Sequence, residues 1–293
     1  LVFYVDSFLH PCKSSTICRD CGLTVAAAMP FSMKMPPLQA KAIDMLKYLW
    51  ILLIGSLLSC KGNKQQAADP QKIVDQAIEA SGGHLYESSD IRFVFRDREY
   101  IRRRENGQRV LERITVTDTG RIADIRTGNR FERRVGGIRQ NLADTTAHKI
   151  SEAVNSVHYF AYLPYGLNDR AVNKKYLGKV KIGDSEYHEI RVTFDQEGGG
   201  TDFEDVFVYW FDVQTFLPEY LAYEYHTNGG GKRFRVAYNT RRVGGLRFVD
   251  YENYKYAGPL PVSDLDSLYQ KGVLEMLSRI EMEAIQVAPG NYN

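Results

Sequence analysis

The chain has 293 residues, with 38 basic and 36 acidic side chains and a net charge of +2. Residues 1–60 carry five of the basic and three of the acidic residues, so the remainder has 33 of each and no net charge. This balance argues against a nucleic-acid-binding protein, which normally shows a strong basic excess. Cys60 is the last cysteine, which excludes a disulfide or a catalytic thiol within residues 61–293.

Residues 45–60, MLKYLWILLIGSLLSC, have the pattern of a secretion signal. Lys47 supplies the positive start, and the apolar run that follows is shorter than the ~20 residues of a membrane span. Leu57-Leu58-Ser59-Cys60 resembles the lipobox of bacterial lipoproteins. The resemblance implies that 45–59 is a signal peptide, that the chain is cut before Cys60, and that the Cys60 thiol carries diacylglycerol.

This interpretation predicts an envelope lipoprotein that is held at a membrane, expected to be the outer membrane, through an N-terminal lipid. Acyl chains contribute roughly 0.8 kcal/mol per buried methylene, so two or three chains give a stable anchor. Residues 60–68 are polar and lack an apolar pattern, which is typical of a flexible tether.

Residues 1–44 show no pattern of a folded domain. We interpret them as an over-extended gene start or as an unstructured segment that is removed with the signal. The alternative is a metal knuckle made by His10, Cys12, Cys18 and Cys21. A structural zinc site needs four ligands on a folded frame, and this segment gives no sign of one.

The first elements after the tether are a helix and a meander of strands, which open a single β-rich domain over 69–288. Asp69 caps the helix, Pro70 takes its first position, and Gly82-Gly83 ends it. Residues 91–95 then alternate apolar and charged side chains, as in a half-buried strand. Glycine-containing turns predict further antiparallel strands at 109–117, 121–127, 130–135 and 138–142.

Asp144 is expected to cap a second helix, which runs to about Ala161. A second run of strands is predicted at 176–183, 186–195, 204–212, 218–227, 232–243 and 246–256. Asp264 caps a last helix with Leu265, Leu268 and Leu274 as candidate buried positions. Residues 280–287 fit either a continuation of that helix or a closing strand.

Charge is uneven along the domain. Residues 61–140 hold 17 basic and 12 acidic side chains. We interpret this excess as solvated strand faces with local ion pairs. The alternative is a basic face directed toward anionic headgroups.

The strand at 206–211, VFVYWF, is apolar on both faces, so both faces must be covered. One cover is expected to be helices, and the other a second sheet, the curl of the same sheet, or a ligand. The predicted fold is therefore mainly β, a curled antiparallel sheet or half-open barrel with two to three helices. Candidate ligand-binding residues are the aromatic side chains of this wall, with two polar residues at the 226–233 loop: Phe207, Tyr209, Trp210, Phe211, Tyr223, Tyr225, Phe234, Tyr238, His226 and Arg233.

Several motifs carry a resemblance to a known family. They include GGHLY at 82–86, VNSVHYFAYLPYGLND at 154–169 and NGGGKRFRVAYN at 228–239. Residues 72–285 resemble a domain family of unknown function found in Gram-negative bacterial lipoproteins. The order of strands and helices also looks like the lipoprotein-carrier fold, a half-open barrel whose members carry apolar ligands. That second resemblance concerns the fold alone, and function does not follow from fold.

Two glycine-rich loops hold the remaining candidate chemistry. The first offers carboxylates for calcium, although the spacing does not match an EF-hand: Asp195, Glu197, Asp202, Glu204 and Asp205. Asp195 with Glu197, or Asp202 with Glu204, is a candidate acid/base pair for hydrolysis. If the 195–205 and 226–233 loops lie at one end of the sheet, they frame the mouth of a site. His158 is expected to be a core histidine bonded to backbone.

The sequence therefore favours non-catalytic binding of a lipid or other apolar ligand, without a cofactor or a metal. Two alternatives stay open: a protein-interaction or scaffold domain with a filled core, and a hydrolase that uses the 195–205 loop. No protein partner is indicated by the sequence.

Overall fold

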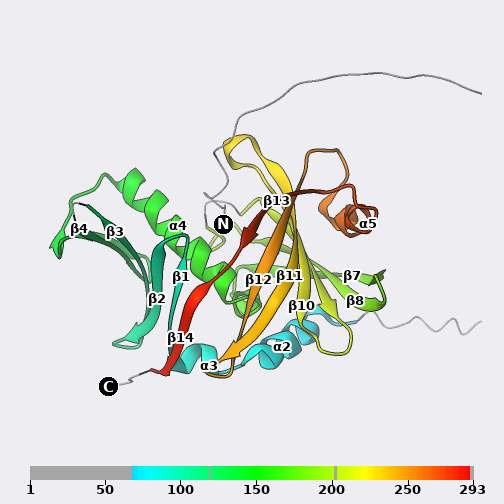
Figure 1. Ribbon diagram of the computed structural model, residues 1–293, viewed down its shortest axis with the longest axis horizontal. Helices are drawn as coiled ribbons and strands as arrows, with labels where there is room; N and C mark the ends of the chain where they lie inside the picture. Colours follow the sequence, from blue (N-terminus) through cyan, green and yellow to red (C-terminus); the bar gives the residue numbers. More distant parts are fainter. Residues whose placement is uncertain (1–67, 119, 201–202, 291–293) are drawn as a thin grey trace, which may run out of the picture. The chain divides into compact units, whose positions relative to one another are not determined.

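The computed structural model describes residues 68–118, 120–200 and 203–290 (Figure 1). Within them the chain forms two antiparallel sheets of seven strands each, together with four α-helices. The predicted fold class, antiparallel and mainly β with few helices, is confirmed. Residues 1–44, the signal 45–59, Cys60 and Asp202 lie outside the described residues, so the predictions made for them stay predictions.

The first sheet has the strand order β14-β1-β2-β3-β4-β5-β6. Strand β14 comes from the C-terminal end of the chain, and the other six follow one another as a meander. Arg96 and Asp97 both have positive φ in the turn between β1 and β2, as a two-residue hairpin requires. The bounds are β1 Ser89–Phe95, β2 Arg98–Glu105, β3 Gln108–Thr117, β4 Gly120–Thr127, β5 Arg130–Val135, β6 Ile138–Arg139 and β14 Glu283–Pro289.

The second sheet has the order β13-β12-β11-β10-β9-β8-β7. All six strands predicted for 176–256 are present; the largest difference is at β7, which begins at Val172. The bounds are β7 Val172–Ile182, β8 Ser185–Phe194, β9 Val206–Asp212, β10 Pro218–Tyr225, β11 Gly231–Val243, β12 Leu246–Tyr256 and β13 Glu275–Ile280.

The two sheets are joined at β13 and β14, which are separated by residues 281–282 alone. β13 pairs with β12 of the second sheet, while β14 pairs with β1 of the first. The backbone N–H of Met282 donates to the Asp250 carboxylate at 3.0 Å, which holds this short link against β12. Of the two alternatives for 280–287, the structure shows a strand, β14, rather than a continued helix. β14 and β13 each form an edge of one sheet.

The long helices are α2, Pro70–Ser81, and α4, Asp144–Ala161. The N–H of Gln71 donates to the Asp69 side chain at 3.0 Å, so the predicted cap of α2 is confirmed. The cap of α4 was predicted wrongly: it is Ala143, and Asp144 is the first helical residue, where its charge suits the positive end of the helix dipole. The short helices are α3 Leu85–Ser88, α5 Leu265–Gln270, and the 3₁₀ turns η1 Tyr165–Asn168, η2 Thr227–Gly229 and η3 Val262–Asp264.

Helix α4 lies between the two groups of strands (Figure 1). It contacts β3, β4 and β5 of the first sheet. Phe160 of α4 packs against Tyr251 of β12, with ring centroids 5.0 Å apart, so the same helix also reaches the second sheet. The helix therefore fills much of the space that the curled strands enclose.

Strand β9 is covered on both faces, as its sequence predicted. Phe207, Tyr209 and Phe211 belong to the main core, which also holds residues of α2 and α4. Val208 and Trp210 point the other way, into a smaller cluster that η3 and α5 cover with Val262 and Leu265. The predicted burial of Leu265 is confirmed, and Leu268 and Leu274 pack against the same cluster.

Candidate functional site

The candidate site is a pocket of about 420 Å³ beside α4. Its floor comes from β2, β3 and β4, one wall comes from α4 and η1, and the rim is formed by the start of β7, the end of β8 and the glycines at 198–200. This volume is within the range of small-molecule pockets, about 300–1,000 Å³. The first sheet, α4 and the second sheet thus all contribute to one concave surface.

Three arginines line the pocket: Arg102, Arg109 and Arg126. Arg126 donates to Glu152 of α4 at 2.8 Å, so its charge is paired. Arg102 is 2% exposed and donates to the backbone oxygen of Ser89 at 3.0 Å. Buried guanidinium groups are seldom left without such partners, because desolvating a charge is unfavourable. Arg102 is therefore held in a fixed position beneath the pocket.

Aromatic side chains form the wall on the side of α4 and η1. Tyr159, Tyr162 and Tyr165 line the pocket, and Tyr165 stacks on Tyr86 with centroids 4.9 Å apart. A Cβ at Gly166 would overlap the Tyr159 ring, so glycine is what lets η1 approach α4 this closely. Among the described residues, the buried hydroxyl of Tyr159 has no hydrogen-bond partner. It is a buried polar group beside the pocket.

His158 is fixed and neutral. Its Nε2 donates to the backbone oxygen of Glu112 at 3.0 Å, which can only accept, so its Nδ1 accepts from the Tyr162 hydroxyl at 3.1 Å. Burial lowers the pKa of His158 to about 3. The prediction of a core histidine bonded to backbone is confirmed, and the imidazole positions Tyr162 at the pocket wall.

Asp169 is the remaining carboxyl at the pocket. Burial raises its pKa, although the positive charge of Arg109 acts in the opposite direction. A raised pKa weakens the tendency of this group to carry a negative charge. Of the residues that the structure describes, Asp169 and Glu152 are the two carboxyl groups that line the pocket.

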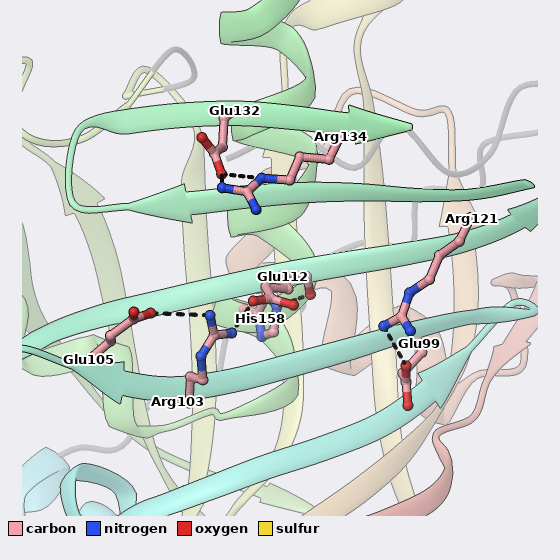
Figure 2. Close-up of polar contacts among 8 residues, drawn as sticks. All are labelled: Glu99, Arg103, Glu105, Glu112, Arg121, Glu132, Arg134 and His158. Carbon is pink, nitrogen blue, oxygen red and sulfur yellow. Dashed lines mark hydrogen bonds and ion pairs between the residues drawn. The ribbon is translucent and has the colours of Figure 1, made fainter. Parts of the chain in front are cut away.

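The outer face of the first sheet is different. Arginines on β2 to β5 pair there with glutamates of the same or a nearby strand. Figure 2 shows Arg103 with Glu105 of its own strand and Glu112 of β3, and Arg134 with Glu132 of its own strand. The sequence interpretation of solvated faces with local ion pairs is confirmed for this side. Successive residues of a strand point to opposite faces, so Leu111 and Arg109 of β3 point into the pocket while Glu112 points to the outer face.

The predicted aromatic ligand residues do not line this pocket. Four of them, Phe207, Tyr209, Phe211 and Tyr223, fill the main core, and Trp210 and Phe234 fill the cluster under α5. Tyr225 receives a hydrogen bond from Arg233 at 2.8 Å, and Tyr238 donates to Glu281. The structure thus brings the aromatic residues together as packing, on the two faces of one sheet.

The two glycine-rich loops lie at one end of the second sheet, because Glu224 of β10 is paired with Val206 of β9. His226 Nδ1 and Asp205 Oδ1 are 3.5 Å apart and connect them. The glycines at 198–200 reach the pocket rim, while no residue of the 226–233 loop does. Both loops therefore lie at the same end of the sheet, as the predicted mouth requires. Of the two, the 195–205 loop contributes to the pocket.

The four carboxylates of the 195–205 loop that the structure describes do not converge. Asp195 accepts a hydrogen bond from Asn173 at 2.7 Å, Glu197 and Glu204 are exposed, and Asp205 is buried beside His226. In the described part of the chain, no three His, Cys, Asp or Glu side chains are grouped so as to hold a metal ion. The carboxyls whose pKa is raised, Asp169, Glu189 and Asp266, belong to other elements.

A second hollow lies on another side of α4, where Phe93, Val157, Phe160 and Met282 line about 30 Å³. A cavity needs roughly 10–15 Å³ for each water, so this space is too small for a ligand. None of the helices in the described ranges is long and apolar enough to cross a membrane.

Sequence reasoning missed Arg102, Arg109, Arg126 and Tyr159 as site residues. The basic excess over 61–140 includes the three arginines, and its second interpretation, a basic face directed toward anionic headgroups, stays a prediction. Sequence does not show which arginines lie on the inner face, because that depends on the strand register.

The model of a family of unknown function, DUF6503, matches residues 47–282. No curated protein matches the chain. A solved LolA superfamily protein from Nitrosomonas europaea is 12% identical, with 78% of this chain and 96% of that chain covered and a TM-score of 0.44. A DUF1329 family protein from Desulfovibrio piger is 7% identical, with 75% of this chain and 93% of that chain covered and a TM-score of 0.42. A Vibrio parahaemolyticus domain described as a putative outer membrane lipoprotein-sorting protein is 8% identical, with 69% of this chain and 100% of that chain covered and a TM-score of 0.36. At these values the three say nothing about what this chain binds.

Proposed function

Since the chain belongs to DUF6503, a family of unknown function, membership supplies no activity, and we propose from the pocket that it is a lipid-anchored envelope protein that binds an amphipathic ligand. The observation that carries the proposal is the 420 Å³ pocket beside α4, which combines tyrosine rings with guanidinium groups. Such a lining suits a ligand with an apolar part and a polar head.

The apolar part of the ligand has its own surface in the pocket. Leu111, Val172 and Phe194 line it together with the rings of Tyr159 and Tyr162. All but Tyr159 are buried, so the surface is rigid before the ligand arrives. A preformed apolar wall reduces the ordering that binding requires. This favours binding over the alternative of a scaffold with a wholly filled core.

The membrane anchor is proposed from the lipobox at 57–60. Replacing Cys60 with alanine is expected to abolish acylation, because the thioether to diacylglycerol needs the thiol. The measurement is incorporation of an alkyne-labelled fatty acid in growing bacteria, followed on a gel. Replacing Asn63 with alanine, three residues after Cys60 in the tether, is the control and should leave the label in place. A labelled Cys60→Ala protein would contradict the anchor.

Ligand binding is tested by filling the pocket. Asn155 of α4 lines it, whereas Lys149 of the same helix is exposed and does not. Asn155→Trp should reduce the lipid that remains with the full chain after purification in a non-ionic detergent, because the indole occupies the ligand's space. Lys149→Trp should retain it. The measurement is mass spectrometry of the non-covalent lipid released by organic solvent, per mole of protein.

Equal lipid contents in the Asn155→Trp and Lys149→Trp proteins would contradict the proposal, as would a wild-type protein without extractable lipid. Either result would favour the scaffold alternative, and crosslinking in the native envelope would then be the appropriate experiment.

A further inference from the structure

We propose that the pocket recognises an anionic group, a phosphate or a carboxylate, and that Arg109 is its principal contact. The inference rests on the proposed function in one respect: the anion is the head of the amphipathic ligand. The argument comes from the balance of charge around the pocket floor.

Among the described residues, the Glu87 carboxylate lies within 4.0 Å of three guanidinium groups at this floor. Glu87 pairs closely with Arg104, while its oxygens are 3.9 Å from Arg102 and 4.0 Å from Arg109. The fourth arginine, Arg126, has Glu152 as its own partner. Among the described residues, four arginines thus face three carboxyl groups, Glu87, Glu152 and Asp169. The floor carries an excess of positive charge.

The arrangement of the strands concentrates this excess. Arg104 of β2 is directly opposite Arg109 of β3 in the sheet register. Like charges placed opposite each other destabilise a sheet pair. Glu87 relieves part of this repulsion from the side of Arg104. An anion bound in the pocket beside Arg109 would reduce the remaining repulsion between Arg104 and Arg109. The repulsion in the empty site therefore favours anion binding.

Arg109 is the member of the group that a ligand can reach. It lines the pocket and its side chain is 46% exposed. Among the described residues its guanidinium makes no hydrogen bond, and its nearest carboxylate oxygen is the one at 4.0 Å. A guanidinium presents a planar fork that fits two oxygens of a phosphate or a carboxylate. Arg109 is therefore pre-placed for an anion, while Arg102 below it is fixed by Ser89.

A second polar group is available on the opposite wall. The buried Tyr159 hydroxyl has no partner within the described residues. Burial raises the pKa of Tyr159, so this hydroxyl stays protonated and donates rather than repels an anion. Tyr159 and Arg109 both line the pocket, so the guanidinium on β3 is the exposed polar contact and the phenol on α4 adds no negative charge beside it.

The test is calorimetric titration of the full chain in a non-ionic detergent with three probes. Dihexanoylphosphatidic acid carries a phosphate, dihexanoylglycerol has the same tails without it, and inorganic phosphate lacks the tails. The phosphatidic acid should bind about tenfold more tightly than the glycerol, corresponding to one well-made charge-assisted contact. Arg109→Gln should remove that tenfold advantage and leave the affinity for dihexanoylglycerol unchanged.

Arg121→Gln is the matched control, because Arg121 is 61% exposed on the outer face and 3.9 Å from Glu99. It should alter none of the affinities. Equal binding of the two lipids, or the same loss in both variants, would overturn the anion inference and leave the proposed function standing. Inorganic phosphate that binds as tightly as phosphatidic acid would support an anion site and overturn the amphipathic ligand. Failure of all three probes to bind would overturn both.

Discussion

Replacing Asp124 with alanine is expected to lower the free energy of unfolding by about 3–5 kcal/mol. Asp124 is 1% exposed on β4 and joins three strands of the first sheet. It accepts from Arg113 of β3 at 2.7 Å and from Arg133 of β5 at 2.6 Å, with further bonds at 3.2 and 3.0 Å. Without the carboxylate, two guanidinium groups lose their shared partner in a desolvated position.

Chemical denaturation measures this change, with Glu99→Ala as the control. Glu99 accepts a hydrogen bond from Arg92 at 2.7 Å and lies 3.9 Å from the Arg121 guanidinium, yet these two arginine side chains are 50% and 61% exposed. Exposed pairs contribute about 0.2–1 kcal/mol, so Glu99→Ala should have a small effect. Similar losses for the two variants would show that Asp124 does not act through burial of its charge pair.

Replacing Glu189 with glutamine is expected to make the protein about 2 kcal/mol more stable at pH 8 and to leave stability at pH 4 unchanged. Glu189 lies opposite Trp210, 7% exposed, and its Oε1 has no hydrogen-bond partner among the described residues. Burial and then the charges of Asp266 and Asp264 raise the pKa of Glu189 from 4.5 to about 7.

The sign follows from proton binding. Between pH 4.5 and 7 the folded protein holds a proton on Glu189 that the unfolded chain has lost, so stability falls as the pH rises through this window. At about 1.4 kcal/mol per pKa unit the full shift is about 3 kcal/mol, and solvent near this side chain reduces it to about 2. Asp266, whose pKa burial also raises, adds a smaller fall of the same sign.

The measurement is the unfolding free energy of the wild type, Glu189→Gln and Glu186→Gln at pH 4, 6 and 8. Glu186 is 51% exposed and pairs with Lys179, so its variant should follow the wild-type curve. A Glu189→Gln curve parallel to that of the wild type would show that the carboxyl ionises freely in the folded protein.

Strands with an apolar alternation and a glycine turn were predictable from sequence, because both signals are local. β12, predicted at 246–256, has the same bounds in the structure. Strand β2, Arg98–Glu105, gave no such signal: its sequence REYIRRRE is almost entirely charged. Its inner face is stabilised by tertiary contacts, since Arg102 donates to the Ser89 carbonyl and Arg104 pairs with Glu87.

The candidate site was predictable in part for the same reason. The sequence of β9 shows that both of its faces are covered, but it does not distinguish a ligand from α5 as the cover of Trp210. The two glycine loops meet at one end of the sheet because strand pairing requires it. The pocket is formed by β3, α4 and the β8–β9 loop, which are far apart in the chain. A local sequence pattern does not predict which distant elements come into contact.

The two-residue link between β13 and β14 also sets when the protein can finish folding. Strand β1, near the start of the domain, waits for a partner at residues 283–289, close to its end. Such distant pairings form slowly, and the edges of β1 and β12 present unpaired backbone groups until the last segment is made. Residues 275–289 therefore complete both sheets together, and a domain that lacks them exposes two strand edges that favour aggregation.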